Sequence, residues 1–126
     1  MMPENTEEKK VFEVEVARKV TLTQQDIDDL ITTALEGGIN HWCDKVTLLT
    51  PMPEGAEWLS EAVSRGGMLT LHYDGGNSVN IDLGLVLNGI KLWMERFSKG
   101  YGIQSADAND ADNIVQLAVF GEVVYG

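Results

Sequence analysis

Side chains that could hold a metal ion or act as a nucleophile gather in one short segment of the chain. His41, Cys43 and Asp44 are near neighbours, and His72 lies in a later segment with a strand-like pattern. If residues 41–45 are extended, His41 and Cys43 project from the same face, and with a carboxylate and a second histidine they could ligate zinc. A small metal-dependent hydrolase that uses His41, Cys43 and His72 is therefore one functional hypothesis.

The spacing of these side chains weighs against that hypothesis. Alternate positions on a strand are about 6.5 Å apart, which is beyond hydrogen-bond reach for a Cys-His nucleophile pair. A structural zinc site needs four ligands, and the second histidine would have to arrive through an unproved strand pairing. We therefore assign no catalytic residue, no metal ligand and no cofactor, and we interpret Cys43 as a half-buried thiol and His41 as an exposed side chain.

A second group of oxygen ligands lies in the run from Asp107 to Asp112, which has the alternation of a calcium loop. The run lacks the residues that a calcium-binding loop needs at several of its ligand and turn positions. Counting Asp107 as the first position, the fifth is Ala111, the sixth is Asp112 where glycine is needed, and the twelfth is Ala118 where glutamate is needed. We interpret the run as the capped start of a helix that Asp110 opens.

Other catalytic motifs do not occur in this sequence. There is no G-x-G-x-x-G, no Walker motif and no G-x-S-x-G elbow. The glycine pairs at 37–38, 66–67 and 75–76 each follow an expected helix or join two expected strands, where chain reversal requires glycine. The sequence thus gives no support for phosphate binding or for a serine triad.

Acidity is the strongest compositional feature. Twenty acidic and nine basic residues give a net charge of −11, which works against binding to phosphate backbones and anionic membranes. Acidic side chains on two expected helices could imitate a row of phosphates for a basic protein partner, although solvated helix faces are also commonly acidic. The candidate partner-binding residues are Asp28, Asp29, Glu36, Glu54, Glu57 and Glu61.

The elements that must position these residues are centred on the segment from Met68 to Phe97. Its alternating pattern predicts a hairpin with a three-residue loop at 75–77, in which Tyr73 pairs with Val79. Leu71 then pairs with Ile81. A strongly apolar helix should follow, with Asp82 as its cap.

The remaining elements follow from periodicity and from capping signals. We expect an α+β fold with a four-stranded, mainly antiparallel sheet and about four helices packed on one face. Residues 1–126 should form a single domain with a disordered tail at 1–9. The other expected elements are a strand from Val11 to Leu22, a helix capped by Thr23 and ended by Gly37-Gly38, a strand from Trp42 to Leu49, a helix from Glu54 to Arg65 with Trp58 turned inward, and a last helix from Asp110.

More apolar surface is present than one helix face can bury. Either the last helix and the C-terminal residues cover it within one chain, or a second subunit does so in a homodimer. The candidate interface residues are Leu85, Leu92, Val123, Val124 and Tyr125.

Compartment is inferred from cysteine content and apolar runs. Cys43 is the only cysteine, which fits a reducing compartment. The N-terminal residues have no apolar signal region, and no apolar run approaches the roughly 20 residues that span a bilayer. We expect a cytoplasmic protein that does not bind membranes.

Four segments resemble a group of mobile-element proteins. Residues 33–42, 66–71, 82–90 and 112–126 look like small acidic proteins, without an assigned activity, from prophages and integrative elements of Gram-positive bacteria. The likeness covers most of the chain beyond the first ten or so residues. It implies a mobile-element origin and transfers no catalytic residue.

These observations favour a non-enzymatic accessory protein that acts through protein-protein interaction. One concrete form is an acidic inhibitor, or nucleic-acid mimic, directed at a host enzyme. Direct nucleic-acid binding would need a basic patch, which nine scattered basic residues do not make.

Overall fold

The computed structural model describes residues 10–15, 19–98 and 100–126. The expected disorder of residues 1–9 lies outside the described residues. The same holds for the strand positions of Val16 and Arg18, and for Lys99 at the end of the long helix.

The described chain has the expected α+β class, with four α-helices, but its strands form two sheets. One sheet has two strands and the other has three, so the prediction of a single four-stranded sheet was wrong. The strands are β1 (Val11–Glu15), β2 (Lys19–Thr23), β3 (Cys43–Leu48), β4 (Leu69–Tyr73) and β5 (Asn77–Ile81). The helices are α1 (Gln24–Thr33), α2 (Leu59–Ala62), α3 (Leu83–Arg96) and α4 (Ala108–Phe120), with short helical turns η1 (Ala34–Gly38), η2 (Val63–Arg65) and η3 (Ile103–Ser105).

The first sheet replaces the long strand expected from Val11 to Leu22. The segment folds back on itself, so that β1 and β2 pair antiparallel with Val11 opposite Thr23 and Val14 opposite Val20. Folding back lets the two halves satisfy each other's backbone hydrogen bonds, which a lone strand of that length could not do. Val14 and Leu22 are buried, so the apolar side still faces the core.

Helix α1 begins where the sequence predicts. The Thr23 hydroxyl accepts a hydrogen bond from the backbone N–H of Asp26 at 3.1 Å, and the Asp26 carboxylate accepts one from the N–H of Thr23 at 2.9 Å. This reciprocal capping box satisfies two otherwise free donors. Leu22 and Ile27, on either side of the cap, are both fully buried.

The hairpin of β4 and β5 has the expected apolar side but a different register. Tyr73 pairs with Asn77 and Leu71 with Val79, so the predicted pairing was wrong by two residues. The loop is residues 74–76 because Asp74 takes a left-handed backbone conformation (φ 55°) beside Gly75 (φ 76°). A shift of two residues leaves every side chain on its predicted face of the sheet.

Helices α3 and α4 pack directly against each other. The Asp82 carboxylate caps α3 by accepting from the N–H of Leu85 at 3.0 Å, as predicted. A methyl group on Gly89 would lie only 2.6 Å from the carbonyl oxygen of Ile114, so the absence of a side chain permits the close approach. Helix α4 starts earlier than predicted, because Asp107 is the N-cap and Asp110 is its capping-box partner.

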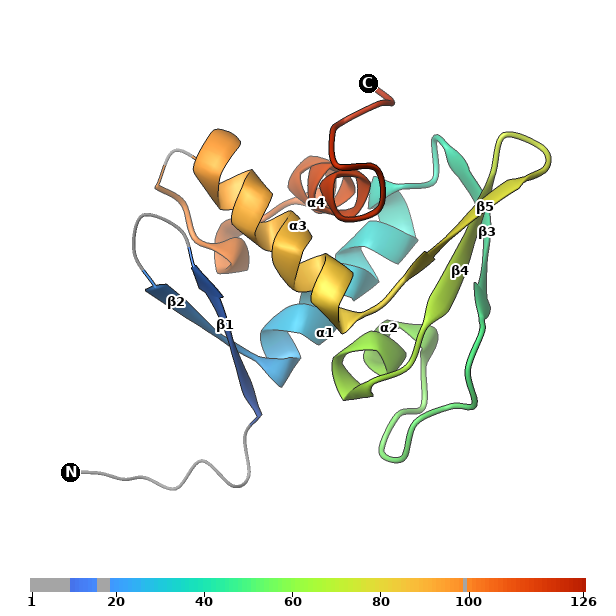
Figure 1. Ribbon diagram of the computed structural model, residues 1–126, viewed down its shortest axis with the longest axis horizontal. Coiled ribbons are helices and arrows are strands. Elements are labelled where there is room, and N and C mark those ends of the chain that lie inside the picture. Colours follow the sequence, from blue (N-terminus) through green and yellow to red (C-terminus); the bar gives the residue numbers. More distant parts are fainter. Residues whose placement is uncertain (1–9, 16–18, 99) are drawn as a thin grey trace.

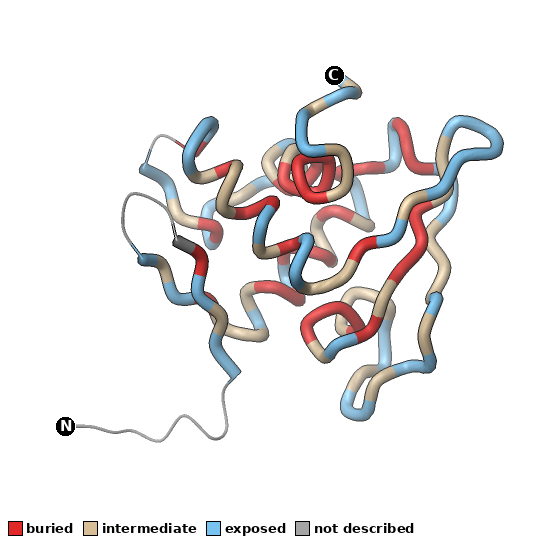
Figure 2. Tube along the Cα trace, viewed as in Figure 1, coloured by how far each residue is buried: buried red, intermediate tan, exposed pale blue. Residues whose placement is uncertain are grey.

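The helices occupy the middle of the molecule, between the two sheets (Figure 1). Helix α3 packs on β1, α1 packs on β2, and α4 packs on β5. Buried residues concentrate where the helices meet each other and the sheets (Figure 2). No helix within the described residues is both long and apolar enough to cross a membrane.

Candidate functional site

An acidic groove lies between α1 and the start of α2. Gln25, Asp29, Thr32 and Glu36 follow at spacings of four and three residues, which places them on one face of the helical segment α1–η1. The groove has a volume of about 410 Å³, within the range of ligand-binding clefts. Its lining residues are Gln25, Asp28, Asp29, Thr32, Glu36, Trp58, Ser60 and Glu61.

The opposite wall of this groove differs from the expected helix. Helix α2 begins only at Leu59, so Glu54 and Glu57 do not lie on a helix and do not line the groove. The positive φ of Gly55 (90°), after two prolines, marks a turn where the prediction placed a helix. The predicted acidic stripe of Glu54, Glu57 and Glu61 was therefore wrong, and only Glu61 remains in the site.

Trp58 lies on the surface, not in the core where the helical pattern predicted it. It was expected to face the core, but it precedes α2 in an extended conformation and its side chain is 67% exposed. A large aromatic side chain with that exposure, on the wall of a groove, is the kind of residue that anchors protein interfaces. The two prolines and Gly55 were the available signals that the helix starts late.

Glu61 holds the turn that presents Trp58. Its carboxylate accepts hydrogen bonds from the backbone N–H groups of Glu57, at 2.7 Å, and Trp58, at 3.2 Å. The hydrogen bond from Glu57 is the main reason that the pKa of Glu61 lies below its usual value. Glu61 thus keeps its negative charge in the groove while it fixes the backbone at Trp58.

Asp28 was predicted to bind a partner, but its carboxylate is already occupied. The residue is 6% exposed, accepts from the Ser64 hydroxyl at 2.6 Å, and forms an ion pair with the Arg65 guanidinium at 3.1 Å. Arg65 also donates to the carbonyl oxygen of Glu61 at 2.9 Å. Asp28 therefore fastens α1 to η2 and supplies no free charge to the groove.

Three groove carboxylates remain without a basic partner among the described residues. These belong to Asp29, Glu36 and Glu61. Asp29 also accepts a hydrogen bond from the Gln25 amide at 2.8 Å, which positions its side chain on the helix. Carboxylates beside an exposed indole can hold a lysine or arginine side chain, through charge-assisted hydrogen bonds and a cation–π contact worth about 0.5–1 kcal/mol at an exposed site.

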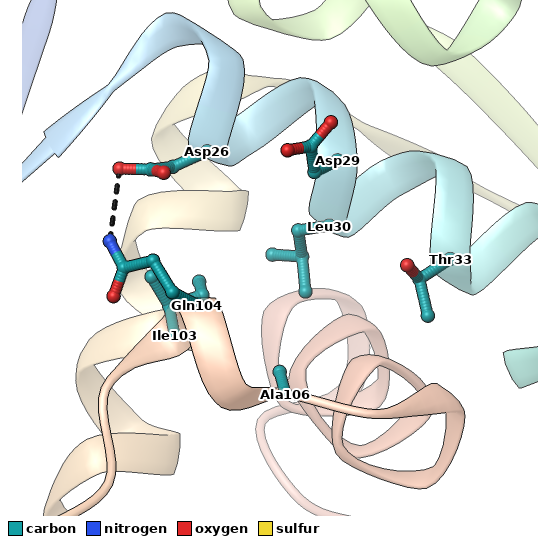
Figure 3. Close-up of a pocket in the computed structure, with 7 residues that line it drawn as sticks. All are labelled: Asp26, Asp29, Leu30, Thr33, Ile103, Gln104 and Ala106. Carbon is teal, nitrogen blue, oxygen red and sulfur yellow. Dashed lines mark hydrogen bonds between the residues drawn. The ribbon is translucent and has the colours of Figure 1, made fainter.

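Another hollow lies on the neighbouring side of α1, facing η3 (Figure 3). Its volume is about 160 Å³, which is small for an organic ligand. Asp26, on its rim, accepts from the Gln104 amide at 3.2 Å and also caps α1. Asp29 lines this hollow as well as the acidic groove, so we assign the hollow no separate function.

The structure does not bring His41, Cys43 and His72 together as one site. His41 Nε2 contacts the Asp112 carboxylate at 2.7 Å, and His72 Nε2 contacts the Thr47 hydroxyl at 2.9 Å. Cys43 is buried, its thiol donates to the carbonyl oxygen of Lys45 at 3.5 Å, and burial raises its pKa. Within the described residues, no three His, Cys, Asp or Glu side chains form a group that could hold a metal ion.

Asp112 belongs to a buried network that sequence reasoning missed. Besides His41, its carboxylate accepts from the Trp42 indole N–H at 2.7 Å and from the Gln116 amide at 2.9 Å. Gln116 is fully buried, and its amide oxygen accepts from the backbone N–H groups of Val124 and Tyr125, both at 2.8 Å. The polar positions of Asp112 and Gln116 within an apolar helix were the available sequence signal.

The predicted interface residues separate into packed and exposed side chains. Tyr125 stacks on Trp42, with ring centroids 5.5 Å apart and an interplanar angle of 2°. Leu92 and Val123 are partly buried against the core, whereas Leu85 and Val124 are exposed. Residues 121–126 and α4 thus cover much of the apolar surface within one chain.

The chain was compared with protein-family models, curated proteins and solved structures. The chain matches no family model, no curated protein and no solved structure.

Proposed function

We propose that this protein is a non-enzymatic interaction protein that binds a basic segment of a protein partner in the acidic groove. The observation that supports this most directly is the exposed indole of Trp58 in the same groove as the carboxylates of Asp29, Glu36 and Glu61. The net charge of −11 would speed the approach of a basic partner and make the encounter sensitive to salt.

The biological form of the proposal is an accessory protein of a mobile genetic element that acts in the host cytoplasm. A nucleic-acid-handling host enzyme is the proposed target, because such an enzyme has a basic surface built for phosphates. The carboxylates of the groove would occupy that surface in place of nucleic acid. Direct competition with DNA for one purified DNA-binding enzyme tests this form.

The hydrolase alternative has less support from the geometry. His41 and His72 contact different polar partners, and Cys43 is buried with a raised pKa.

A homodimer is a separate proposal, for which exposed Leu85 and Val124 are the available contacts. Analytical ultracentrifugation of the wild-type protein and of Leu85→Glu tests it.

The groove is tested with a fluorescein-labelled oligoarginine peptide as a basic probe. We expect saturable binding that weakens by at least tenfold between about 0.05 and 0.5 M salt, because exposed charges are screened over roughly 4 Å at the higher value. Trp58→Ala should weaken binding by about fivefold or more, from the loss of the cation–π and apolar contact. Binding that half-molar salt leaves unchanged would contradict the proposal.

A matched pair of double variants separates the groove from overall charge. Asp29→Asn with Glu36→Gln, and Glu54→Gln with Glu57→Gln, each remove two negative charges from exposed positions. Only the first pair lies in the groove. We expect at least a tenfold loss of affinity for the first pair and less than threefold for the second; equal losses would mean that net charge alone attracts the probe.

A further inference from the structure

Residues 121–126 fold back onto the helix that precedes them. They form neither helix nor strand, and Gly121, which ends α4, takes a left-handed backbone conformation (φ 78°) that reverses the chain. Val124 and Tyr125 thereby return to Gln116, which lies one helical turn before the end of α4. One reversed residue is thus enough to seat this segment on its own helix.

Gln116 binds the segment through main-chain atoms. Its amide oxygen accepts from the backbone N–H groups of Val124 and Tyr125, both at 2.8 Å, and its amide nitrogen donates to the carbonyl oxygen of Tyr125 at 3.0 Å. The same nitrogen donates to the Asp112 carboxylate at 2.9 Å, which fixes the orientation of the amide. Other sequences with the same backbone course offer the same donors and acceptor, so these contacts do not depend on side-chain identity.

The ring of Tyr125 makes the contact that does depend on side-chain identity. It stacks on Trp42, with ring centroids 5.5 Å apart. It also meets the rings of Phe120 and Tyr73, with centroids at 6.1 and 6.4 Å and interplanar angles of 57° and 75°. We name the set of Gln116, Trp42, Tyr73 and Phe120 the Gln116 site. Main-chain hydrogen bonds combined with one aromatic anchor are a common way for proteins to bind peptides.

Few contacts hold the chain's own segment in the Gln116 site. Val124 contributes its backbone N–H, while its side chain is 52% exposed. Gly121, Glu122 and Gly126 are exposed as well. A short flexible connection gives such a segment an effective concentration on the order of millimolar. A partner segment that binds more tightly than this can therefore displace it.

We propose that the Gln116 site is a peptide-binding site, which residues 121–126 occupy in the isolated chain and which a partner protein opens with a segment of the same chemistry. That chemistry is an aliphatic residue followed by an aromatic one, both with free backbone N–H groups, because Val124 and Tyr125 already satisfy the site. A second copy of the chain is the poorer occupant, since its identical segment gains no contact by the exchange. The Gln116 site shares no residue with the acidic groove, so the proposal does not depend on that groove.

The neutral peptide acetyl-Val-Val-Tyr-Gly-amide copies residues 123–126 and serves as the probe. In nuclear magnetic resonance of the ¹⁵N-labelled wild-type chain, it should displace the chain's own segment. The backbone amide signals of Val124 and Tyr125 should then move saturably toward those of an unstructured peptide, with half-displacement at about 1–10 mM probe. The Trp42 indole signal should move much less, because one tyrosine ring replaces another. Amide signals that stay in place at about 10 mM probe would overturn the proposal.

Two full-length variants should loosen the segment, and a third is their control. Val124→Pro lacks the N–H that Gln116 accepts and replaces an exposed side chain, and Tyr125→Ala withdraws the ring. We expect the probe to bind about threefold more tightly to the first variant than to wild type, and about tenfold more tightly to the second. Glu122→Gln, at an exposed position of the same segment, should leave the affinity unchanged. Equal affinities of Val124→Pro and Glu122→Gln would contradict the proposal.

Analogues of the probe test what the site recognises, with Tyr125→Ala as the receptor. Phenylalanine in place of the probe's tyrosine should keep the affinity within about threefold, whereas alanine should lower it by about tenfold or more. Binding should not change between about 0.05 and 0.5 M salt, because the probe is uncharged. A stable heterodimer of the wild-type chain with Tyr125→Ala in analytical ultracentrifugation would assign the site to a second copy and overturn the proposed partner.

Discussion

The indole N–H of Trp42 donates a hydrogen bond to the carboxylate of Asp112 across 2.7 Å, although the two residues are 70 positions apart. This bond joins the turn immediately before β3 to α4 inside the molecule. Asp112 is 4% exposed, and its carboxylate also accepts a hydrogen bond from the Gln116 amide. His41 Nε2 contacts the same carboxylate and donates to it in the tautomer that carries the proton on Nε2. A carboxylate buried to this extent would be costly without hydrogen-bond donors around it.

Removal of Asp112 should therefore destabilise the fold. We expect Asp112→Ala to lower the free energy of unfolding by about 2–4 kcal/mol, because the Trp42 and Gln116 donors stay buried without an acceptor. Urea unfolding followed by circular dichroism measures the loss. Asn109→Ala, at an exposed position on the same helix, should change the free energy by less than about 0.5 kcal/mol. Similar losses for both variants would contradict the network.

Two glycines of α3 should respond in opposite directions to alanine. Gly89→Ala would place a methyl group 2.6 Å from the Ile114 carbonyl oxygen and 2.9 Å from the Ala118 Cβ, and we expect a loss of about 1–3 kcal/mol from overpacking. Gly84 has only the Asp82 side chain nearby, at 3.6 Å. Gly84→Ala should stabilise the protein by up to about 0.5–1 kcal/mol through helix propensity. Thermal unfolding of both variants measures the difference, and a neutral Gly89→Ala would mean that α3 and α4 pack less closely.

The carboxylate of Glu61 should titrate at a lower pH than a glutamate in an unstructured peptide. Backbone hydrogen bonds, above all from Glu57, lower its pKa in the folded protein. Because the folded pKa is below the unfolded one, its contribution to stability is present above the unfolded pKa and is lost as the pH falls through the folded pKa. Carboxyl ¹³C chemical shifts measured against pH test this prediction, and an unshifted titration would contradict the two hydrogen bonds.

The thiol of Cys43 should be slow to react in the folded protein. Burial raises its pKa, so little thiolate forms at neutral pH, and the same burial blocks access. We expect alkylation by iodoacetamide at pH 7.5 to be at least tenfold slower in buffer than in concentrated urea. As a control, Leu49→Cys in a Cys43→Ala background presents an exposed thiol, which should react at nearly the same rate in both solvents. Fast alkylation of Cys43 in buffer would reopen the nucleophile hypothesis.

Elements that depend on neighbours in the sequence were predictable. The caps at Thr23 and Asp82 involve a side chain and a backbone group three residues away, so residue type and spacing decide them. The apolar face of the β4–β5 hairpin was predictable for the same reason. Its register was not, because Asp74 adopts a left-handed conformation that the pattern of apolar residues does not encode.

The sequence by itself determined the α+β class, the four helices, two of the helix caps and the acidic character of the surface, because composition, periodicity and local hydrogen bonds carry that information. Only the tertiary structure decided that the strands form two sheets and that Trp58 is exposed beside the acidic groove. It also decided that Asp28 forms an ion pair with Arg65, whereas Asp29 has no basic partner among the described residues. Each of these outcomes depends on which distant segments pack together. The energy of that packing is shared among many weak contacts, and no short stretch of sequence contains it.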